Sequence, residues 1–213
     1  MTDAGSQICI LDYGMGNLRS VEKALEHVSV RATRSSDHDV AREADGLILP
    51  GVGAFPRAMS RIRELGLDEL IAERRDGGVP VLGVCLGLQL LFGSTTELGG
   101  DSGLGLLDGD VVGLEAEGQK VPHIGWAPVR WERESPLTDG IDSETPFYFV
   151  HSFVPRPSDD EVLGTAAYGS RFACAAERDN VFGVQFHPEK SSGAGLRLLS
   201  NFARICAAAP AAA

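Results

Sequence analysis

Gly83-Val84-Cys85-Leu86-Gly87 joins two apolar runs, residues 79–84 and residues 86–92. The first run predicts a buried strand and the second a buried helix. Glycines on both sides of the cysteine permit a sharp turn where a Cβ would clash. A cysteine on such a turn has the pattern of a nucleophile elbow, which presents the sulfur at the carboxyl end of a strand and at a helix N-terminus that favours a thiolate. A structural cysteine buried in the core is the alternative, because free cysteine is among the most buried residue types.

The first half of the chain alternates predicted strands and helices around this turn. Strands are expected over residues 7–13, 30–34, 46–49 and 79–84, and helices over residues 18–28, 55–65 and 67–75. Strands separated by helices imply a parallel sheet with helices on both faces. Ligands bind at the carboxyl ends of the strands in such sheets. We expect Cys85 and the glycine turns at residues 14–16 and 50–53 to share that edge.

The second half of the chain has the pattern of short strands joined by turns. Strands are expected over residues 110–114, 127–131, 147–150, 162–168, 172–176 and 181–186, with a hairpin around residues 178–180 and a final helix over residues 195–205. We therefore predict an α/β fold whose mixed, mainly parallel sheet has helices on both faces and added antiparallel strands. Residues 1–213 are expected to form a single domain, with a disordered tail over residues 206–213.

Composition and charge narrow the possible partners. The formal net charge of -11 argues against nucleic-acid binding, which needs a basic surface. The N-terminus lacks the pattern of a signal peptide, and the longest apolar stretch, residues 79–92, is too short for a membrane span. The four cysteines show no metal-binding spacing, so we expect a reduced, cytoplasmic protein without a metal site.

His187-Pro188-Glu189 directly follows the strand expected over residues 181–186. Pro188 favours an extended His187, and residues i and i+2 of an extended chain point to the same side. Glu189 could then bond one imidazole nitrogen and leave the other as a base for Cys85, which is the arrangement of a catalytic triad. A surface turn is the alternative for these three residues taken alone.

Two further segments suit acyl transfer, in which the tetrahedral oxyanion needs N–H donors. The backbone N–H of Leu86 is one candidate, and Val52 or Gly53 offers the second, unless their turn is an ordinary loop. Gln89 lies one helical turn past Cys85 inside an apolar run, where an unpaired buried amide would cost about 1–3 kcal/mol. Gln89 therefore either meets backbone partners or faces a polar ligand.

The stretch from Gly83 to Gln89, taken together with His187-Pro188-Glu189, resembles the motifs of the class I (triad) glutamine amidotransferases. Within that family the chain is similar to the glutaminase subunits of imidazole glycerol phosphate synthase, through four further segments: residues 12–17, 50–55, 122–126 and 147–153. The resemblance runs from about Ile8 to Phe202. It implies the flavodoxin-like α/β fold of that family and no cofactor.

The resemblance implies a role for each candidate residue. Cys85 would attack the carboxamide carbon of glutamine, His187 would act as base and acid, and Glu189 would orient His187. Water would then hydrolyse the glutamyl thioester. A larger set would hold the substrate, with Glu97 facing its amino group: Gly53, Gln89, Glu97, His151, Ser152 and Phe153.

The resemblance also implies a partner. Ammonia would pass to a separate (β/α)8 cyclase/synthase subunit, which makes imidazole glycerol phosphate and an aminoimidazole carboxamide ribotide in histidine biosynthesis. The site side of this chain, with Asn17, His123 and Trp126, would dock on that barrel in a heterodimer. Ala127 departs from the family pattern, which often has Asn there, and Phe153 lacks an aromatic hydroxyl.

Other functions stay open at this stage. A glutaminase subunit serving pyridoxal phosphate, anthranilate or GMP synthesis would usually show Pro-Gly-Gly after the third strand, whereas this chain has Pro50-Gly51-Val52-Gly53. A cysteine peptidase or thioesterase is disfavoured by Gln89 and Glu97, which suit a small amino-acid substrate. A non-catalytic binding homologue would usually lack a triad residue, and all three candidates are present.

Overall fold

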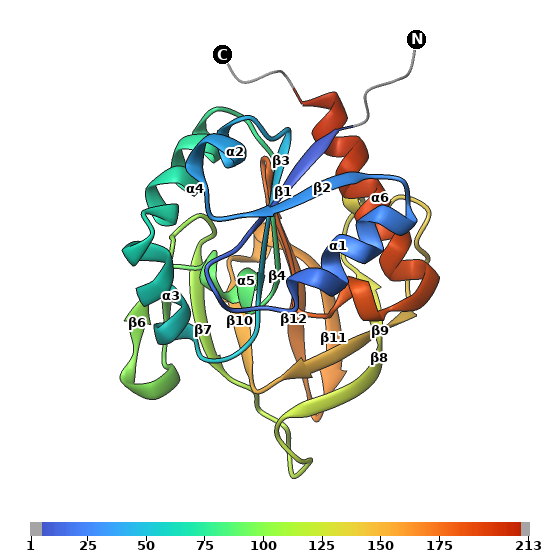
Figure 1. Cartoon of the computed structure of the whole chain (residues 1–213). Coiled ribbons are helices and arrows are strands. Elements are labelled where there is room, and N and C mark those ends of the chain that lie inside the picture. Colours follow the sequence, from blue (N-terminus) through green and yellow to red (C-terminus); the bar gives the residue numbers. More distant parts are fainter. Residues whose placement is uncertain (1–5, 210–213) are drawn as a thin grey trace.

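Nine strands form the central sheet of the computed structural model, which describes residues 6–209 (Figure 1). Five neighbouring strands run parallel, in the order β2-β1-β3-β4-β13. They are β1 (Gln7–Leu11), β2 (Arg31–Ser35), β3 (Gly46–Gly51), β4 (Val81–Cys85) and β13 (Val181–Val184). The sheet continues antiparallel through β12 (Ser170–Arg178), β11 (Val162–Tyr168), β8 (His123–Trp131) and β9 (Thr145–His151). The predicted mixed sheet and the hairpin around residues 178–180 are confirmed.

Hydrophobic cores lie on both faces of this sheet. Ile8 and Ile10 of β1 enter one core, whereas Cys9 and Leu11 enter the other, because successive side chains of a strand point to opposite faces. Helices α1 (Leu18–His27) and α6 (Ser192–Ala208) cover the first face (Figure 1). The second face is covered by α2 (His38–Arg42), α3 (Phe55–Glu64), α4 (Leu67–Asp76) and α5 (Leu86–Leu90). Helices on both faces were predicted, and the structure confirms them.

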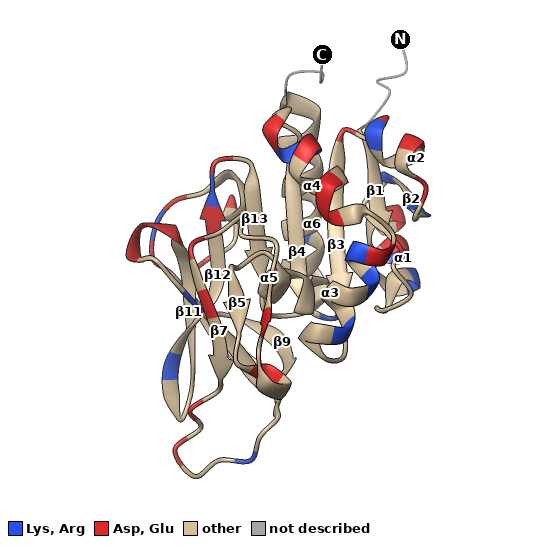
Figure 2. Cartoon of the chain, turned by 90° about the vertical axis from the view of Figure 1, so that its left-hand side faces the viewer, with Lys and Arg blue, Asp and Glu red and all other residues tan. Residues whose placement is uncertain are grey.

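The strands in the middle of the sheet carry no charged residue, as Figure 2 shows for β3 and β4. β13 is likewise uncharged, and all three strands are buried along their whole length. A strand covered on both faces cannot solvate a charge, so its sequence is a continuous apolar run rather than an alternating one. This is why the apolar runs at residues 46–49, 79–84 and 181–186 identified these strands.

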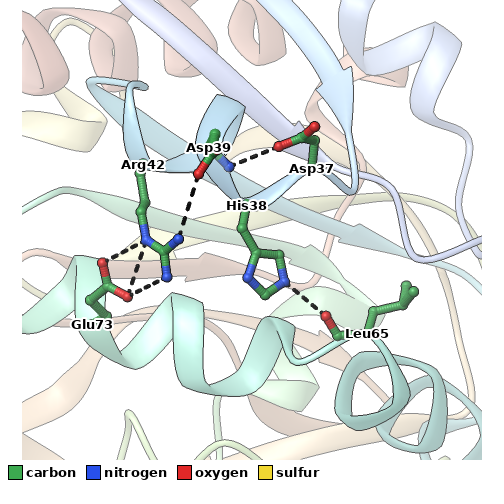
Figure 3. Close-up of polar contacts among 6 residues, drawn as sticks. All are labelled: Asp37, His38, Asp39, Arg42, Leu65 and Glu73. Atoms are coloured by element: carbon green, nitrogen blue, oxygen red, sulfur yellow. Dashed lines mark hydrogen bonds and ion pairs between the residues drawn. The ribbon is translucent and has the colours of Figure 1, made fainter.

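Helix α2 is not predicted by the sequence patterns, and polar contacts fix it to its neighbours (Figure 3). Asp37 accepts a hydrogen bond from a backbone N–H in the first turn of α2, at 2.8 Å. Arg42 donates to Glu73 of α4 through Nε and Nη2, each at 3.0 Å. His38 Nε2 donates to the carbonyl oxygen of Leu65 at 2.8 Å. These contacts give His38 a structural role between α2 and the α3–α4 connection.

A second sheet of four strands adjoins the central one, and it was not predicted. Its order is β10-β7-β5-β6, with β10 (Phe153–Pro157), β7 (Gly109–Gly113), β5 (Ser94–Thr95) and β6 (Asp101–Ser102). Of these strands, the sequence predicted β7 alone. Short 3₁₀ turns complete the regular elements: Glu97–Gly99, Pro136–Thr138, Asp159–Glu161 and Pro188–Lys190.

The last helix extends further than predicted. α6 runs through Ala208, so residues 206–208, expected in a disordered tail, are helical, and Cys206 is buried in the core. Alanine is the strongest helix former, which explains why the alanine-rich end prolongs the helix. Residues 210–213 of the expected tail lie outside the described residues. Between residues 6 and 209, no helix has both the length and the apolar character needed to cross a membrane.

Candidate active site

Cys85 ends β4 and directly precedes α5, which is the position predicted for the elbow. Its backbone has φ 57° and ψ -110°, a conformation that few residues with a side chain adopt and that is typical of strained functional turns. The flanking glycines serve close packing rather than the turn angles. A Cβ on Gly87 would lie 1.7 Å from the carbonyl oxygen of Leu49, and one on Gly83 would lie 2.6 Å from that of Gly87. The sequence therefore pointed to the right glycines for a different physical reason.

His187 and Glu189 make the predicted contact. Nδ1 of His187 lies 2.9 Å from Oε1 of Glu189, and both side chains are buried. His187 is extended, but Pro188–Lys190 forms a 3₁₀ turn. This turn, rather than an extended i, i+2 alternation, brings Glu189 back to the imidazole ring. Because Nδ1 is bonded to Glu189, Nε2 is the ring nitrogen that remains for Cys85.

The sheet brings Cys85 and His187 together although they are far apart in sequence. β4 and β13 are parallel neighbours, with Val84 opposite Val184, so Cys85 and His187 lie at the carboxyl ends of adjacent strands. The backbone N–H of His187 donates to the carbonyl oxygen of Tyr148 at 2.9 Å. The imidazole is thus held from its backbone as well as from its ring.

Hydrogen bonding favours the protonated form of the His187 imidazole. Burial lowers the pKa of His187, but hydrogen bonds to Cys85 and Glu189 outweigh this effect and raise the pKa from 6.5 to about 10. The residue is therefore positively charged at neutral pH, beside the sulfur of Cys85. A charged imidazole next to a thiol is the environment that favours a nucleophilic thiolate.

A cavity of about 330 Å³ opens over Cys85. It brings together two members of the predicted triad, both turns predicted to supply N–H donors and all of the predicted substrate-binding residues. Its lining comprises Val52, Gly53, Cys85, Leu86, Gln89, Glu97, Pro122, Val150, His151, Ser152, Phe153, His187 and Lys190. Glu189 lies behind His187 and does not line it. A cavity of this size suits a small molecule rather than a polymer.

The turn after β3 is supported from beneath by Tyr13. The hydroxyl of Tyr13 donates to the carbonyl oxygen of Pro50 at 2.7 Å. A Cβ on Gly51 would lie 2.9 Å from Cβ of Leu86, so the turn and the start of α5 are in close contact. Gly53 has φ +107°, a conformation that favours glycine. The segments predicted to supply N–H donors, Val52-Gly53 and Leu86, therefore meet at one edge of the cavity.

Gln89 meets partners inside the protein while it also lines the cavity. Its Nε2 donates to the carbonyl oxygen of Phe153 at 3.1 Å and to Oε1 of Gln185 at 3.0 Å. Glu97 has a similar double position, since Oε2 accepts the backbone N–H of Phe55 at 2.8 Å and the residue still lines the cavity. Both alternatives considered for Gln89 from the sequence are thus combined in one side chain.

The three residues predicted to dock on a partner differ in their exposure. Asn17 is exposed, and Trp126 is 51% exposed on β8. His123 is 2% exposed and stacks between Phe149 and Tyr168, with ring centroids 5.1 Å and 4.1 Å away. Alternation along β8 turns the His123 side chain inward, so it lies beneath the face on which Trp126 is exposed.

The sequence comparisons agree with this geometry. The model of the family "Glutamine amidotransferase class-I" matches residues 9–206. The chain belongs to the class I glutamine amidotransferases. The amidotransferase is 51% identical over 199 residues to "Imidazole glycerol phosphate synthase subunit HisH" of Moorella thermoacetica, covering 93% of this chain and 94% of that protein. It is 49% identical over 197 residues to the protein of the same name from Aquifex aeolicus, covering 92% and 95%. The resemblance inferred from the motifs is confirmed, and with it the expectation of an enzyme.

Solved structures support the fold of the amidotransferase. A crystal structure described as a glutamine amidotransferase matches with a TM-score of 0.75 at 21% identity, covering 94% of this chain and 98% of that one. A structure described as PurLQS from Thermotoga maritima matches with a TM-score of 0.71 at 20% identity, covering 93% and 97%. At these identities the likeness concerns the fold.

Two polar residues of the amidotransferase site were missed in the sequence. Lys190 lines the cavity, and its Nζ lies 5.9 Å from the ring centroid of Tyr148. Gln185 is completely buried, with Nε2 3.8 Å from Sγ of Cys85. Lys190 could have been found from its place directly after His187-Pro188-Glu189. A glutamine inside the otherwise apolar strand at residues 181–186 was the available signal for Gln185.

A second, larger cavity of the amidotransferase lies away from Cys85. It measures about 1090 Å³ and is lined by residues at the opposite end of the sheet, including Pro80 before β4 and Asn180 before β13. Trp131 and Asn201 also contribute to it. Within residues 6–209, no group of three or more His, Cys, Asp or Glu is arranged to hold a metal ion.

Proposed function

We propose that this chain is the glutaminase subunit of an imidazole glycerol phosphate synthase. It hydrolyses glutamine to glutamate and ammonia and passes the ammonia to a (β/α)8 synthase subunit. The observation that carries the proposal is the alignment of Cys85, His187 and Glu189 beside a small cavity. The identity of 51% to a protein named as this subunit supports the choice of reaction and partner.

The proposed reaction begins at the sulfur of Cys85. The thiolate attacks the carboxamide carbon of glutamine, and the N–H groups of Leu86 and of Val52 or Gly53 bind the oxyanion. His187, charged beside Cys85, gives its proton to the departing nitrogen, so the C–N bond breaks and ammonia leaves. His187 then takes a proton from water, which hydrolyses the thioester to glutamate and restores the thiolate. Glu189 holds Nδ1 of His187 throughout.

The cavity lining supports a zwitterionic amino acid as the substrate. Glu97 supplies a carboxylate for the α-amino group, and Oε2 is held by the backbone N–H of Phe55. We propose that the remaining contacts come from the other residues predicted to bind substrate: Gly53, Gln89, His151, Ser152 and Phe153. No step of this scheme calls for a cofactor.

We propose that the partner docks beside the mouth of the cavity. Two large apolar side chains of β8 are exposed there, Ile124 at 60% and Trp126 at 51%. Asn17 is exposed as well. His123 lies beneath this surface, in contact with His151 of the cavity lining. The proposed compartment is the cytoplasm, because all four cysteines are unpaired.

Ammonia release from glutamine tests this proposal. The purified chain is assayed alone and together with a (β/α)8 synthase subunit and its nucleotide ligand. We expect rapid release of ammonia in the complex. Cys85→Ala should abolish release, whereas the matched variant Cys9→Ala should retain it. Equal release by the wild type and Cys85→Ala would contradict the catalytic assignment. Activation by the synthase subunit of pyridoxal phosphate or anthranilate synthesis instead would contradict the partner and leave the triad intact.

A further inference from the structure

Gln185 occupies a position that the reaction scheme above does not use. It follows β13, two residues before His187, and is 0% exposed. Its backbone N–H donates to the carbonyl oxygen of Cys174 at 2.8 Å, which fixes where its side chain starts. Its amide group lies between the sulfur of Cys85 and the amide group of Gln89. A buried primary amide needs partners for its donors and its acceptor, so these contacts determine its orientation.

The hydrogen-bond partners leave one orientation for both amides. The carbonyl oxygen of Phe153 can only accept, so the side chain of Gln89 must turn its nitrogen toward it, at 3.1 Å. The same nitrogen lies 3.0 Å from Gln185, which must therefore present its oxygen. With the oxygen of Gln185 assigned to Gln89, its nitrogen faces Sγ of Cys85 at 3.8 Å. A flipped amide would set two donors against each other.

We propose that Gln185 is a positioning residue that donates an N–H to the sulfur of Cys85 and holds it as a thiolate aimed into the cavity. The role in hydrolysis rests on the proposed glutaminase function, whereas the hydrogen bond itself does not. A donor to an ionised acceptor forms a stronger bond than one to a neutral acceptor, so this contact favours the thiolate over the thiol.

Two features separate this role from simple packing. The contact approaches the sulfur from within the core, whereas His187 and the oxyanion donors face the cavity. Cys85 Sγ also lies 3.8 Å from the carbonyl oxygen of Val150, to which only the protonated thiol can donate. The thiol and the thiolate thus have different partners, and Gln185 supplies the one that suits the thiolate.

Alkylation of Cys85 by iodoacetamide, measured as a function of pH on the full chain, tests the proposal. Gln185→Glu keeps the size and an acceptor for Gln89 but turns an oxygen toward the sulfur. Gln185→Met removes both contacts. We expect alkylation at neutral pH to be about tenfold slower in Gln185→Met and slower still in Gln185→Glu, with the pH midpoint moved upward. The Cys85→Ala variant supplies the background from the other thiols.

Thr138→Val is the matched control, because Thr138 is a buried residue near the opposite end of the sheet and the change removes its side-chain hydrogen bond to the carbonyl oxygen of Ser135. It should keep the wild-type alkylation profile. A wild-type profile in Gln185→Glu overturns the proposal, and so does an equal shift in Thr138→Val. Should Gln185→Met fail to fold, the isosteric Gln185→Glu decides. Failure of the proposed function is a separate result, namely no ammonia from the wild-type complex despite normal alkylation.

Discussion

Nδ1 of His123 lies 3.1 Å from Nε2 of His151, and this contact determines the tautomer of both rings. Nδ1 of His151 faces the carbonyl oxygen of Phe153 at 3.1 Å, so it must carry a proton and donate. Nε2 of His151 is then an acceptor, which the Nδ1–H of His123 satisfies. Burial and the neighbouring His123 lower the pKa of His151 to about 3, so the pair is neutral at physiological pH.

The neutral histidine pair makes stability depend on acid. His151 has a lower pKa in the folded state than its ordinary 6.5, so below pH 6.5 the unfolded chain binds a proton that the folded chain excludes. This difference in proton binding has almost no effect on stability above pH 6.5, and the loss of stability grows as the pH falls toward 3. At pH 5 we expect His151 alone to lower the free energy of unfolding by about 2 kcal/mol, offset in part by His187, whose raised pKa favours the folded chain as the pH falls from 7 to 5. Urea unfolding at pH 7 and pH 5 measures it.

His151→Gln removes this titration but keeps a donor for Phe153 and an acceptor for His123. Between pH 7 and pH 5 the wild type should therefore lose about 2 kcal/mol of unfolding free energy relative to this variant. His27→Gln is the matched control, because His27 is exposed at the end of α1. An equal acid sensitivity in His151→Gln and the wild type would show that His151 is protonated in the folded state.

Replacing Glu189 by Gln tests the orienting carboxylate. A glutamine oxygen can still accept the Nδ1–H of His187, but it cannot stabilise the positive ring. The pKa of His187 should fall from about 10 toward 6.5, and we expect ammonia release in the complex to drop about a hundredfold. NMR titration of His187 and the glutaminase rate measure the two effects. An unchanged rate with a lowered pKa would mean that the charge of His187 does not matter for catalysis.

Gly87 should tolerate no side chain. Gly87→Ala would place a Cβ 1.7 Å from the carbonyl oxygen of Leu49, and we expect a loss of about 3 kcal/mol or more in the free energy of unfolding. Gly113→Ala is the matched control, since nothing lies within 4 Å of its Cβ position and its φ is not positive. Urea unfolding midpoints compare them. Equal midpoints for both variants would refute the close contact between α5 and β3.

The exposed apolar surface of β8 should bind the partner. Trp126→Ala should weaken binding of the (β/α)8 subunit, raising the dissociation constant about tenfold or more, because large exposed aromatic residues dominate such interfaces. The isolated chain should keep its thermal stability and its rate of Cys85 alkylation. Ala207→Asp, exposed near the end of α6, serves as the control for a remote change. Affinity is measured by calorimetry, and unchanged binding by Trp126→Ala would move the interface elsewhere.

Local sequence patterns predicted the central strands and the elbow because these features depend on neighbours in the chain. The strands β3, β4 and β13 are uninterrupted apolar runs, and a 3₁₀ turn of three residues carries the contact between His187 and Glu189. Short strands gave weaker signals. β5 and β6 contain two residues each, and β10 includes two prolines, which strands usually avoid.

Residues defined by distant partners escaped prediction or were misplaced. Gln185 contacts Cys85 and Gln89, which lie 100 and 96 positions away, and no local spacing reports such contacts. The sequence does not show which of the docking candidates is exposed: His123 is buried and Trp126 exposed, because the two side chains leave opposite faces of β8. The alanine-rich end was taken for a tail because low complexity was weighed above helix propensity.

β13 lies between β4 and β12 in the sheet but comes near the end of the sequence, so the site beside Cys85 is completed late in synthesis. Synthesis delivers Cys85 early, but the neighbour that completes the sheet beside it is among the last segments to leave the ribosome. A nascent chain that ends before residue 181 carries the sulfur with neither its base nor the amide of Gln185. Glutamine hydrolysis by the proposed route is thereby withheld from incomplete molecules, because its proposed acid and base, His187, has not yet been added to the chain.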